Sequence, residues 1–329
     1  MYEALLKQTP EYQKIAAALA SPGPAALFGL PPAGRALVYG LLARDLGRPL
    51  CIVTPGEAEA THFAEDLKAL GVAADVFPPR DFMLRPVEGA GREYEYRRLS
   101  VLGALAGGRL AAVCVPVEAL LQYTVPRAEF MANTLTLKPG MQFSREGLVQ
   151  RLFAAGYVRR SQVEGPGQFS VRGDIVDIFP PDMQSPARLE FWDDEIDSIS
   201  SFDLMSQRRD ASLQKIYLSP AREVLFGSTA ETAGALRQAI RKARGKHRAA
   251  LEKAMAHDLD QLDAGLMPEA MDKYYGLRYP TPATLLDHMD APLLLLDEVG
   301  GIRDAQKAAQ YRRSEELTGL LEEDRKSVV

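Results

Sequence analysis

Two glycines with four residues between them, Gly29 and Gly34, constrain the fold of this chain more than any other feature. They follow a strand-like run that ends at Phe28 and precede a helix-like run over residues 36–43. A phosphate-binding loop has this arrangement: Gly, four residues, then Gly-Lys-Ser/Thr, between a strand and a helix. Glycines and prolines between a strand and a helix are also typical of an ordinary turn, so the spacing alone leaves both interpretations open.

The residues that perform chemistry in such a loop are replaced here. Arg35 stands in place of the lysine, and its guanidinium fork is bulkier than a compact ammonium group. Ala36 replaces the hydroxyl residue and has no oxygen for magnesium. Pro31 and Pro32 remove two backbone N–H donors that a phosphate would need. We therefore interpret residues 29–36 as a degenerate nucleotide loop and expect a recruiting protein, not an enzyme, with no cofactor in this chain.

Short apolar runs alternate with helical stretches in the first third of the chain, which predicts a helix-covered parallel sheet of the P-loop, RecA/helicase-like kind. The expected strands lie near residues 25–29, 50–54, 73–77 and 111–115. A fully apolar run at residues 293–296 is followed by Asp297 and Glu298, as in a Walker B strand, and is expected to complete this sheet. Such acids position magnesium and water in ATPases, but beside Arg35 and Ala36 we favour a structural remnant.

The pattern of apolar runs changes between residues 120 and 218, where one helix is followed by closely spaced strands. An α+β domain with an antiparallel sheet is expected there as an insertion. We expect a helix over residues 144–155 and strands over residues 168–172, 175–179, 188–192 and 196–202. The predicted domains are residues 1–119, 120–218 and 219–329, the last one largely helical. The chain stops in a charged helix without a natural ending, so we expect a piece of a longer protein.

Composition excludes several classes of protein. A net charge of -5 argues against a protein whose main task is wrapping nucleic acid. Cys51 and Cys114 lie in apolar strand-like runs, which predicts buried reduced thiols and a cytosolic setting. Signal-peptide and membrane-spanning patterns are missing. Four scattered histidines and no paired cysteines give no spacing typical of metal ligands.

Charge is unevenly distributed along the chain. Residues 138–172 contain six basic and two acidic residues, whereas residues 173–203 contain one basic and nine acidic residues. Such segregation is typical of an electrostatically steered protein interface, and equally of solvated faces whose charges pair internally. The basic run at residues 237–253 is consistent with contacts to DNA phosphates, although a solvated helix face is the simpler interpretation.

A family resemblance emerges in the middle of the chain, in the runs 168–180 and 188–197. They resemble the second domain of the nucleotide excision repair protein UvrB, and more closely the matching domain of the transcription-repair coupling factors of the Mfd family. The match extends to residues 77–81, 202–203, 206–208 and 218–223. UvrB has an intact P-loop and a tyrosine-rich hairpin that inserts into DNA, whereas the segment from Asp75 to Arg98 is short and rich in Pro and Gly. Both departures are typical of the amino-terminal UvrB-homology module of the Mfd family.

The resemblance implies a function in repair. Such a module imitates UvrB, binds UvrA and brings repair to an RNA polymerase stalled at a lesion. The polymerase-binding domain and the DNA translocase motor, which uses ATP and magnesium, would lie beyond residue 329. The family's UvrA-contacting arginines correspond to Arg172 and Arg159. Ser170 stands where UvrB has another arginine, with Arg160 as a candidate replacement, and the weaker candidates are Phe169, Asp174 and Val176.

Three hypotheses follow. The first is a non-catalytic adaptor that binds UvrA through residues 120–218. The second is a UvrB-like, ATP-dependent repair enzyme with unusual loop chemistry, against which the replaced loop residues argue. The third is a DNA-binding module that uses the 237–253 helix, against which the overall charge argues.

Overall fold

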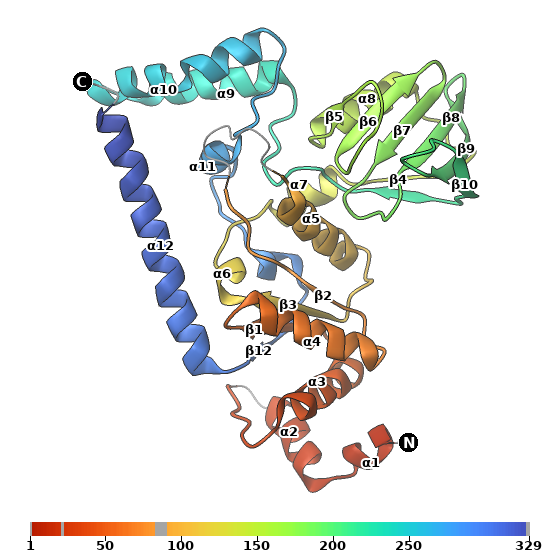
Figure 1. The fold of residues 1–329 in the computed structure, drawn as a ribbon, viewed down its shortest axis with the longest axis vertical. Coiled ribbons are helices and arrows are strands. Elements are labelled where there is room, and N and C mark those ends of the chain that lie inside the picture. Colours follow the sequence, from red (N-terminus) through yellow and green to blue (C-terminus); the bar gives the residue numbers. More distant parts are fainter. Residues whose placement is uncertain (1, 21–22, 83–90, 327–329) are drawn as a thin grey trace. The chain divides into compact units, whose positions relative to one another are not determined.

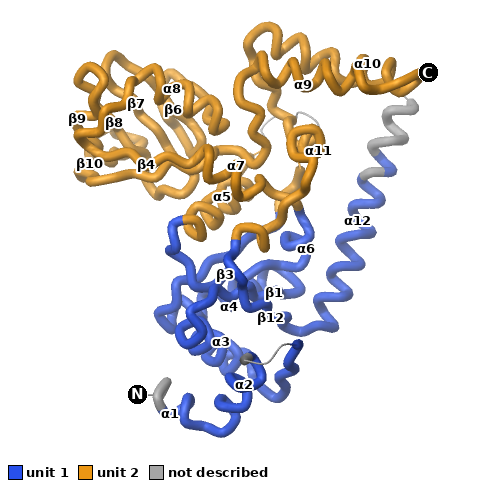
Figure 2. Tube along the Cα trace, turned by 180° about the vertical axis from the view of Figure 1, so that it is seen from behind, with its two compact units in different colours: residues 1–79, 107–122, 289–329 blue, residues 80–106, 123–288 orange. Residues whose placement is uncertain are grey.

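A computed structural model describes residues 2–20, 23–82 and 91–326 and divides the chain into two compact units (Figures 1 and 2). Unit 1 contains residues 1–79, 107–122 and 289–329, and unit 2 contains residues 80–106 and 123–288. The three-domain division expected above stays a prediction. The structure groups residues 80–106 and 219–288 with the expected insertion.

Unit 1 is built on a four-stranded parallel sheet with the strand order β12-β1-β3-β2. Its strands are β1 (Leu50–Thr54), β2 (Ala74–Val76), β3 (Ala112–Pro116) and β12 (Leu293–Leu296). Strand β12 returns from the far end of the sequence and pairs with β1, with Leu293 opposite Leu50. The expectation that residues 293–296 join the first sheet is thus confirmed. Residues 123–288, which belong to unit 2, lie between β3 and β12 in the sequence.

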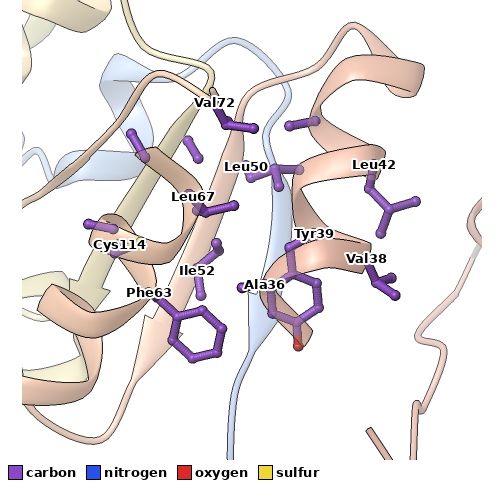
Figure 3. Packing of buried hydrophobic residues seen from close by; sticks show 14 of the residues in the cluster. Ala36, Val38, Tyr39, Leu42, Leu50, Ile52, Phe63, Leu67, Val72 and Cys114 are labelled. Carbon is purple, nitrogen blue, oxygen red and sulfur yellow. The ribbon is translucent and has the colours of Figure 1, made fainter. Parts of the chain in front are cut away.

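In its described residues, unit 1 also contains six helices, of which α1 to α4 pack with the buried strands into the core. They are α1 (Tyr2–Lys7), α2 (Pro10–Ala20), α3 (Pro32–Leu46), α4 (Glu57–Ala69), α6 (Val117–Leu120) and α12 (Val299–Lys326). Figure 3 shows Tyr39 of α3 beside Phe63 of α4, and their rings stack 5.8 Å apart. None of the helices described here is long and apolar enough to cross a membrane.

Both cysteines are free and buried in the strands of unit 1, as expected. Cys51 lies on β1 and Cys114 on β3, where Cys114 is opposite Ile52 in the register. Burial raises the pKa of each thiol to about 12. Since the thiolate is the reactive form, these cysteines are packing residues.

The strand expected near residues 25–29 is wrong. Residues 24–31 form no strand, and Phe28 is 88 % exposed. The places on both sides of β1 are taken by β12 and β3, and the run before Gly29 is not added at the β12 or β2 edge of the sheet either. Helix α3 begins at Pro32, where a proline fits because the first helical N–H needs no partner.

Unit 2 contains a six-stranded sheet with the order β10-β9-β8-β7-β6-β5, in which only the β5–β6 pair is parallel. Its strands are β5 (Val158–Arg159), β6 (Gln168–Arg172), β7 (Ile175–Phe179), β8 (Ala187–Trp192), β9 (Glu195–Phe202) and β10 (Arg209–Ser212). Helix α8 (Arg145–Ala154) packs on one face through Leu148 and Leu152. The expected helix over 144–155 and the four expected strands of this sheet are confirmed, whereas β5 and β10 were not anticipated.

The remaining elements of unit 2 are mostly helical. They are α5 (Glu93–Ala106), α7 (Arg127–Ala132), α9 (Thr229–Lys242), α10 (Lys246–Asp263), α11 (Tyr275–Arg278), two 3-10 turns at Asp272–Tyr274 and Leu285–His288, and the antiparallel pair β4 (Leu135–Leu137) and β11 (Ile216–Leu218). The Pro/Gly segment expected between Asp75 and Arg98 includes residues 83–90, which lie outside the described residues.

A buried charge network joins four segments of unit 2. Arg98 on α5 is fully buried, and its Nε donates to Oε1 of Glu223 at 2.6 Å. Arg80 donates to both carboxylate oxygens of Asp272, at 2.9 and 3.0 Å. Glu95 accepts the backbone N–H of Glu223 at 2.9 Å. Burial alone would raise the pKa of Glu95, but the nearby cations, Arg80 foremost, lower it to about 2. Two of the motifs that carried the resemblance, residues 77–81 and 218–223, each contribute to this network.

We expect Glu223→Gln to lower the free energy of unfolding by about 3 kcal/mol, because Arg98 would lose its countercharge while remaining buried. Urea denaturation followed by far-UV circular dichroism measures this. The double variant Arg98→Met, Glu223→Leu should recover much of the loss, since it leaves no unpaired charge. Equal stability of Glu223→Gln and wild type would contradict this account.

Candidate functional site

The β6–β7 hairpin presents Arg172 at the end of a strand. Arg172 pairs with Ile175 in the register, so Gly173 and Asp174 form a two-residue turn, as expected. Gly173 has a φ of 59°, a left-handed conformation that glycine adopts without steric cost. The side chain of Arg172 is 48 % exposed. A tight turn thus fixes the backbone of an accessible arginine.

The guanidinium of Arg172 is oriented by a buried carboxylate on the next strand. Its Nη2 donates to Oδ2 of Asp177 at 2.7 Å, and Asp177 is 1 % exposed. Arg188 of β8 donates to both oxygens of the same carboxylate, at 2.7 and 2.9 Å. Arg188 therefore satisfies Asp177 by itself. Arg172 is thus oriented through Nη2 while nearly half of its side chain remains exposed.

The turn itself is fastened to the first residue of α8. Ser144 caps this helix by accepting the N–H of Gly147. The adjacent Arg145 donates through Nη1 to the carbonyl of Gly173 at 2.7 Å and to Asp174 at 2.9 Å. Asp174 is 80 % exposed, so its carboxylate stays accessible although it accepts from Arg145. Sequence reasoning counted Arg145 only as part of a basic stretch, because no local pattern reveals its contact 28 residues away.

Arg159 and Arg172 leave the sheet from opposite faces. Arg159 is paired with Phe169 in the register, and paired residues share a face, which here is the one covered by α8. Arg172 follows Phe169 by three positions and lies on the other face. Arg159 lines a hollow of about 570 Å³ together with Val171 and Gly173. A flat partner surface therefore cannot contact both arginines at once. A partner that contacts both has to extend around the edge of the sheet that β5 forms.

Arg160 lies just beyond β5, and its N–H donates to the carbonyl of Phe169 at 2.8 Å. Its side chain is exposed and lines a cleft of about 940 Å³ with Arg159, Phe153 and Leu266. Arg160 is thus accessible, but its surroundings differ from those of Arg172.

Two of the expected contact residues are unavailable to a partner. Phe169 and Val176 are both 0 % exposed and pack in the core between the sheet and α8. They shape the hairpin and cannot present side chains outward, because strand alternation directs them inward. Ser170 is 1 % exposed and lies opposite Asp177 across the β6–β7 pair.

The degenerate loop of unit 1 ends in an internal ion pair. Arg35 donates through Nη1 to Oδ1 of Asp297 at 2.8 Å and to Oε1 of Glu298 at 2.9 Å. Gly29 lies in coil with a φ of 83°, and Gly34 lies inside the first turn of α3. Ala36 is 1 % exposed and faces the core. Arg35 is therefore shared by the two acids that follow β12.

Asp297 is nearly buried just beyond the end of β12. Its backbone N–H donates to the carbonyl of Val53 at 2.9 Å, and its side chain is 5 % exposed. Burial raises the pKa of Asp297, and the charge of Arg35 opposes that rise. Burial, followed by the charge of Asp297, raises the pKa of the neighbouring Tyr39 to about 12. The charge of Arg35 therefore favours the ionised form of Asp297, which burial disfavours.

Comparison with known proteins identifies the middle of the chain. Residues 135–224 match the family model of the UvrB interaction domain. The chain is 30 % identical over 308 residues to a transcription-repair-coupling factor of Bacillus subtilis, covering 90 % of this chain and 26 % of that protein. It is 23 % identical over 305 residues to the corresponding protein of Staphylococcus aureus and 24 % identical over 305 residues to that of Staphylococcus epidermidis, with 89 % of this chain and 26 % of each relative covered. The chain thus spans about a quarter of the length of these relatives.

The six-stranded sheet and the elements packed on it therefore form a UvrB interaction domain. Over 90 % of its length the chain is similar to transcription-repair-coupling factors, which supports the resemblance to their amino-terminal UvrB-homology module.

We expect Arg35→Ala to lower the free energy of unfolding by about 2 kcal/mol at pH 7, because it leaves the nearly buried Asp297 without a cation. A buried carboxyl with a raised pKa favours the protonated folded state, so the deficit should shrink as the pH falls. Denaturant unfolding at pH 7 and pH 5 measures both effects. The matched variant Arg35→Ala, Asp297→Asn should regain part of the stability, and a deficit that grows on acidification would contradict the assignment.

Proposed function

We propose that this chain is a non-catalytic adaptor that imitates UvrB and binds UvrA through the β5–β7 end of its antiparallel sheet. In the longer protein it would recruit UvrA to an RNA polymerase stalled at a lesion, in the bacterial cytoplasm. Contacts to the polymerase and to DNA, and ATP-dependent translocation, would belong to other parts of that protein. The similarity to transcription-repair-coupling factors supports this role.

The arrangement of Arg172 is the observation that carries the proposal. The guanidinium of Arg172 is half exposed and is already oriented by a buried carboxylate. It therefore loses little further conformational freedom when a partner binds, and it can bind a carboxylate through two donors. Arg159 and Arg160 would contribute at the neighbouring edge of the sheet.

The alternative is a UvrB-like, ATP-dependent repair enzyme. The degenerate loop does not fit a nucleotide with its magnesium ion: Pro31 and Pro32 lack N–H donors, Ala36 is buried and has no oxygen ligand, and Arg35 is engaged by Asp297. The parallel sheet alone does not favour catalysis, because a fold hosts many functions. We therefore favour the adaptor.

We expect Arg172→Ala to weaken UvrA binding by about 2 kcal/mol or more, on the scale of an interface hot spot. Stability should change by less than about 0.5 kcal/mol, because Arg188 still satisfies both oxygens of Asp177. Arg172→Lys should give an intermediate affinity, since it keeps the charge and loses the fork. Titration calorimetry with purified UvrA measures each affinity, and thermal unfolding measures stability.

Two further variants delimit the surface. Arg159→Ala should weaken binding less, because this side chain lies on the other face of the sheet. Arg209→Ala should bind normally, since β10 forms the opposite edge of the sheet, where Arg209 pairs with Glu190. An unchanged Arg172→Ala complex would place the interface elsewhere, and a wild-type chain that fails to bind UvrA would overturn the function itself.

We also expect the chain neither to bind ATP at micromolar concentration nor to hydrolyse it. Isothermal titration with ATP and magnesium, and a phosphate-release assay, measure this directly. Turnover above background that Arg35→Ala or Asp297→Asn abolishes would establish the alternative enzyme.

A further inference from the structure

A helical hairpin of unit 2 concentrates cations at its loop end. Helices α9 and α10 lie side by side in Figure 1 and are joined by residues 243–245. The twelve residues from 237 to 248 contain six arginines or lysines and no acidic residue, in a chain with a net charge of -5. The cations are Arg237, Arg241, Lys242, Arg244, Lys246 and Arg248. We call residues 241–248 the hairpin tip.

The tip is open to solvent and its charge is largely uncompensated. Every residue from 244 to 250 is exposed. Two cations have partners: Arg237 pairs with Asp263 at 2.5 Å and Arg248 with Glu252 at 3.0 Å. Within the described residues, no ion pair involves the other four cations, which are Arg241, Lys242, Arg244 and Lys246.

The stability of the hairpin explains only part of this charge. Arg241 and Lys242 lie in the last turn of α9, where cations complement the negative end of the helix dipole. Lys246 and Arg248 lie in the first turn of α10, at the positive end, where cations are unfavourable and no acidic residue is present. By contrast, α9 begins with a capping box of Ser228 and Glu231. The cations at the start of α10 thus destabilise that helix end. Residues that break such a local rule are often found at functional sites.

The chemistry of the tip favours a phosphate polyanion over a protein partner. Its uncharged residues are Ala243 and Gly245, and it also carries His247. Protein interfaces are centred on aromatic or other large apolar side chains and are poor in lysine. Single-stranded nucleic acids are bound through aromatic residues that stack on bases, and the tip has none. Cations without such anchors match the repeating phosphates of a duplex.

We propose that the hairpin tip binds the phosphate backbone of duplex DNA without reading its sequence. This contact uses a surface separate from the Arg172 hairpin, so it goes beyond the UvrA-binding function. Base edges and lesions are not read by lysines and arginines that contact only phosphates. Binding is therefore weak, independent of lesions and strongly dependent on salt.

The test measures fluorescence anisotropy of a labelled 30-base-pair duplex of random sequence with the full chain, from 25 to 200 mM salt. The tip variant replaces four cations: Arg241→Gln, Lys242→Gln, Arg244→Gln and Lys246→Gln. Each phosphate contact contributes about 0.9 to the slope of log affinity against log salt. We expect the tip variant to lose more than about ten-fold in affinity at 25 mM salt and to reduce the slope by about three.

A charge-matched control separates the tip from net charge. It removes two lysines and two arginines that are exposed elsewhere on the chain: Lys14→Gln, Lys138→Gln, Arg208→Gln and Arg303→Gln. This control should retain at least a third of the wild-type affinity. Equal losses in the two variants would overturn the proposal.

Three further outcomes would also overturn it: tighter binding of single-stranded DNA than of the duplex, preference for a lesion-containing duplex at 150 mM salt, or displacement of the duplex by polyglutamate at equal charge concentration.

UvrA affinity of the tip variant should equal that of wild type. Its far-UV circular dichroism should match that of wild type, which verifies that the hairpin is folded.

Discussion

The fully buried ion pair between Arg98 and Glu223 is the interaction on which the rest of unit 2 depends. A guanidinium without water must have its donors satisfied, so α5 and the segment after β11 have to meet at this point. The same segment supports the proposed binding surface. The carbonyl of Ser219 accepts the hydroxyl of Tyr157 at 2.8 Å, and the N–H of Ala221 donates to the carbonyl of Ala155 at 2.8 Å. The loop that leads into β5 is therefore anchored, through Glu223, to the charged core.

The chain uses one kind of contact, a guanidinium beside a carboxylate, with different degrees of exposure. Arg98 is closed to solvent, and its bonds are fully used inside the protein. Arg35 is largely covered and neutralises Asp297 where a nucleotide site would need free charge. Arg172 is half exposed and shares Asp177 with Arg188. Exposure, more than residue type, therefore distinguishes the arginine proposed to bind a partner from the two that serve the fold.

Sequence patterns predicted what depends on local periodicity and missed what depends on distant partners. Buried apolar runs located the strands of the parallel sheet and four of the six strands of the other sheet, and the acidic end of the 293–296 run identified its return to the first sheet. The strand expected before Gly29 was wrong because an apolar pattern does not show whether a run pairs with a sheet edge, and this run pairs with neither β12 nor β2. The pairing of Arg35 with Asp297 spans 262 positions, and no pattern within a window reports it. The opposite faces of Arg159 and Arg172 follow from the β5–β6 register, which a two-residue strand does not reveal in advance.

The net charge of the chain disfavours contact with DNA, but charge acts only over a limited distance in salt, as the α9–α10 hairpin illustrates. Asp258 lies twelve residues after Lys246 along α10, which corresponds to ~18 Å at 1.5 Å per residue. The Debye length at physiological salt is ~8 Å, so acids at the base of the hairpin are screened from a phosphate at its tip. A duplex that approaches the tip meets the local cations, and the acidic remainder of the chain contributes mainly at low ionic strength. A net charge of -5 therefore limits how much nucleic acid the chain can wrap, and it does not prevent a contact confined to one exposed loop.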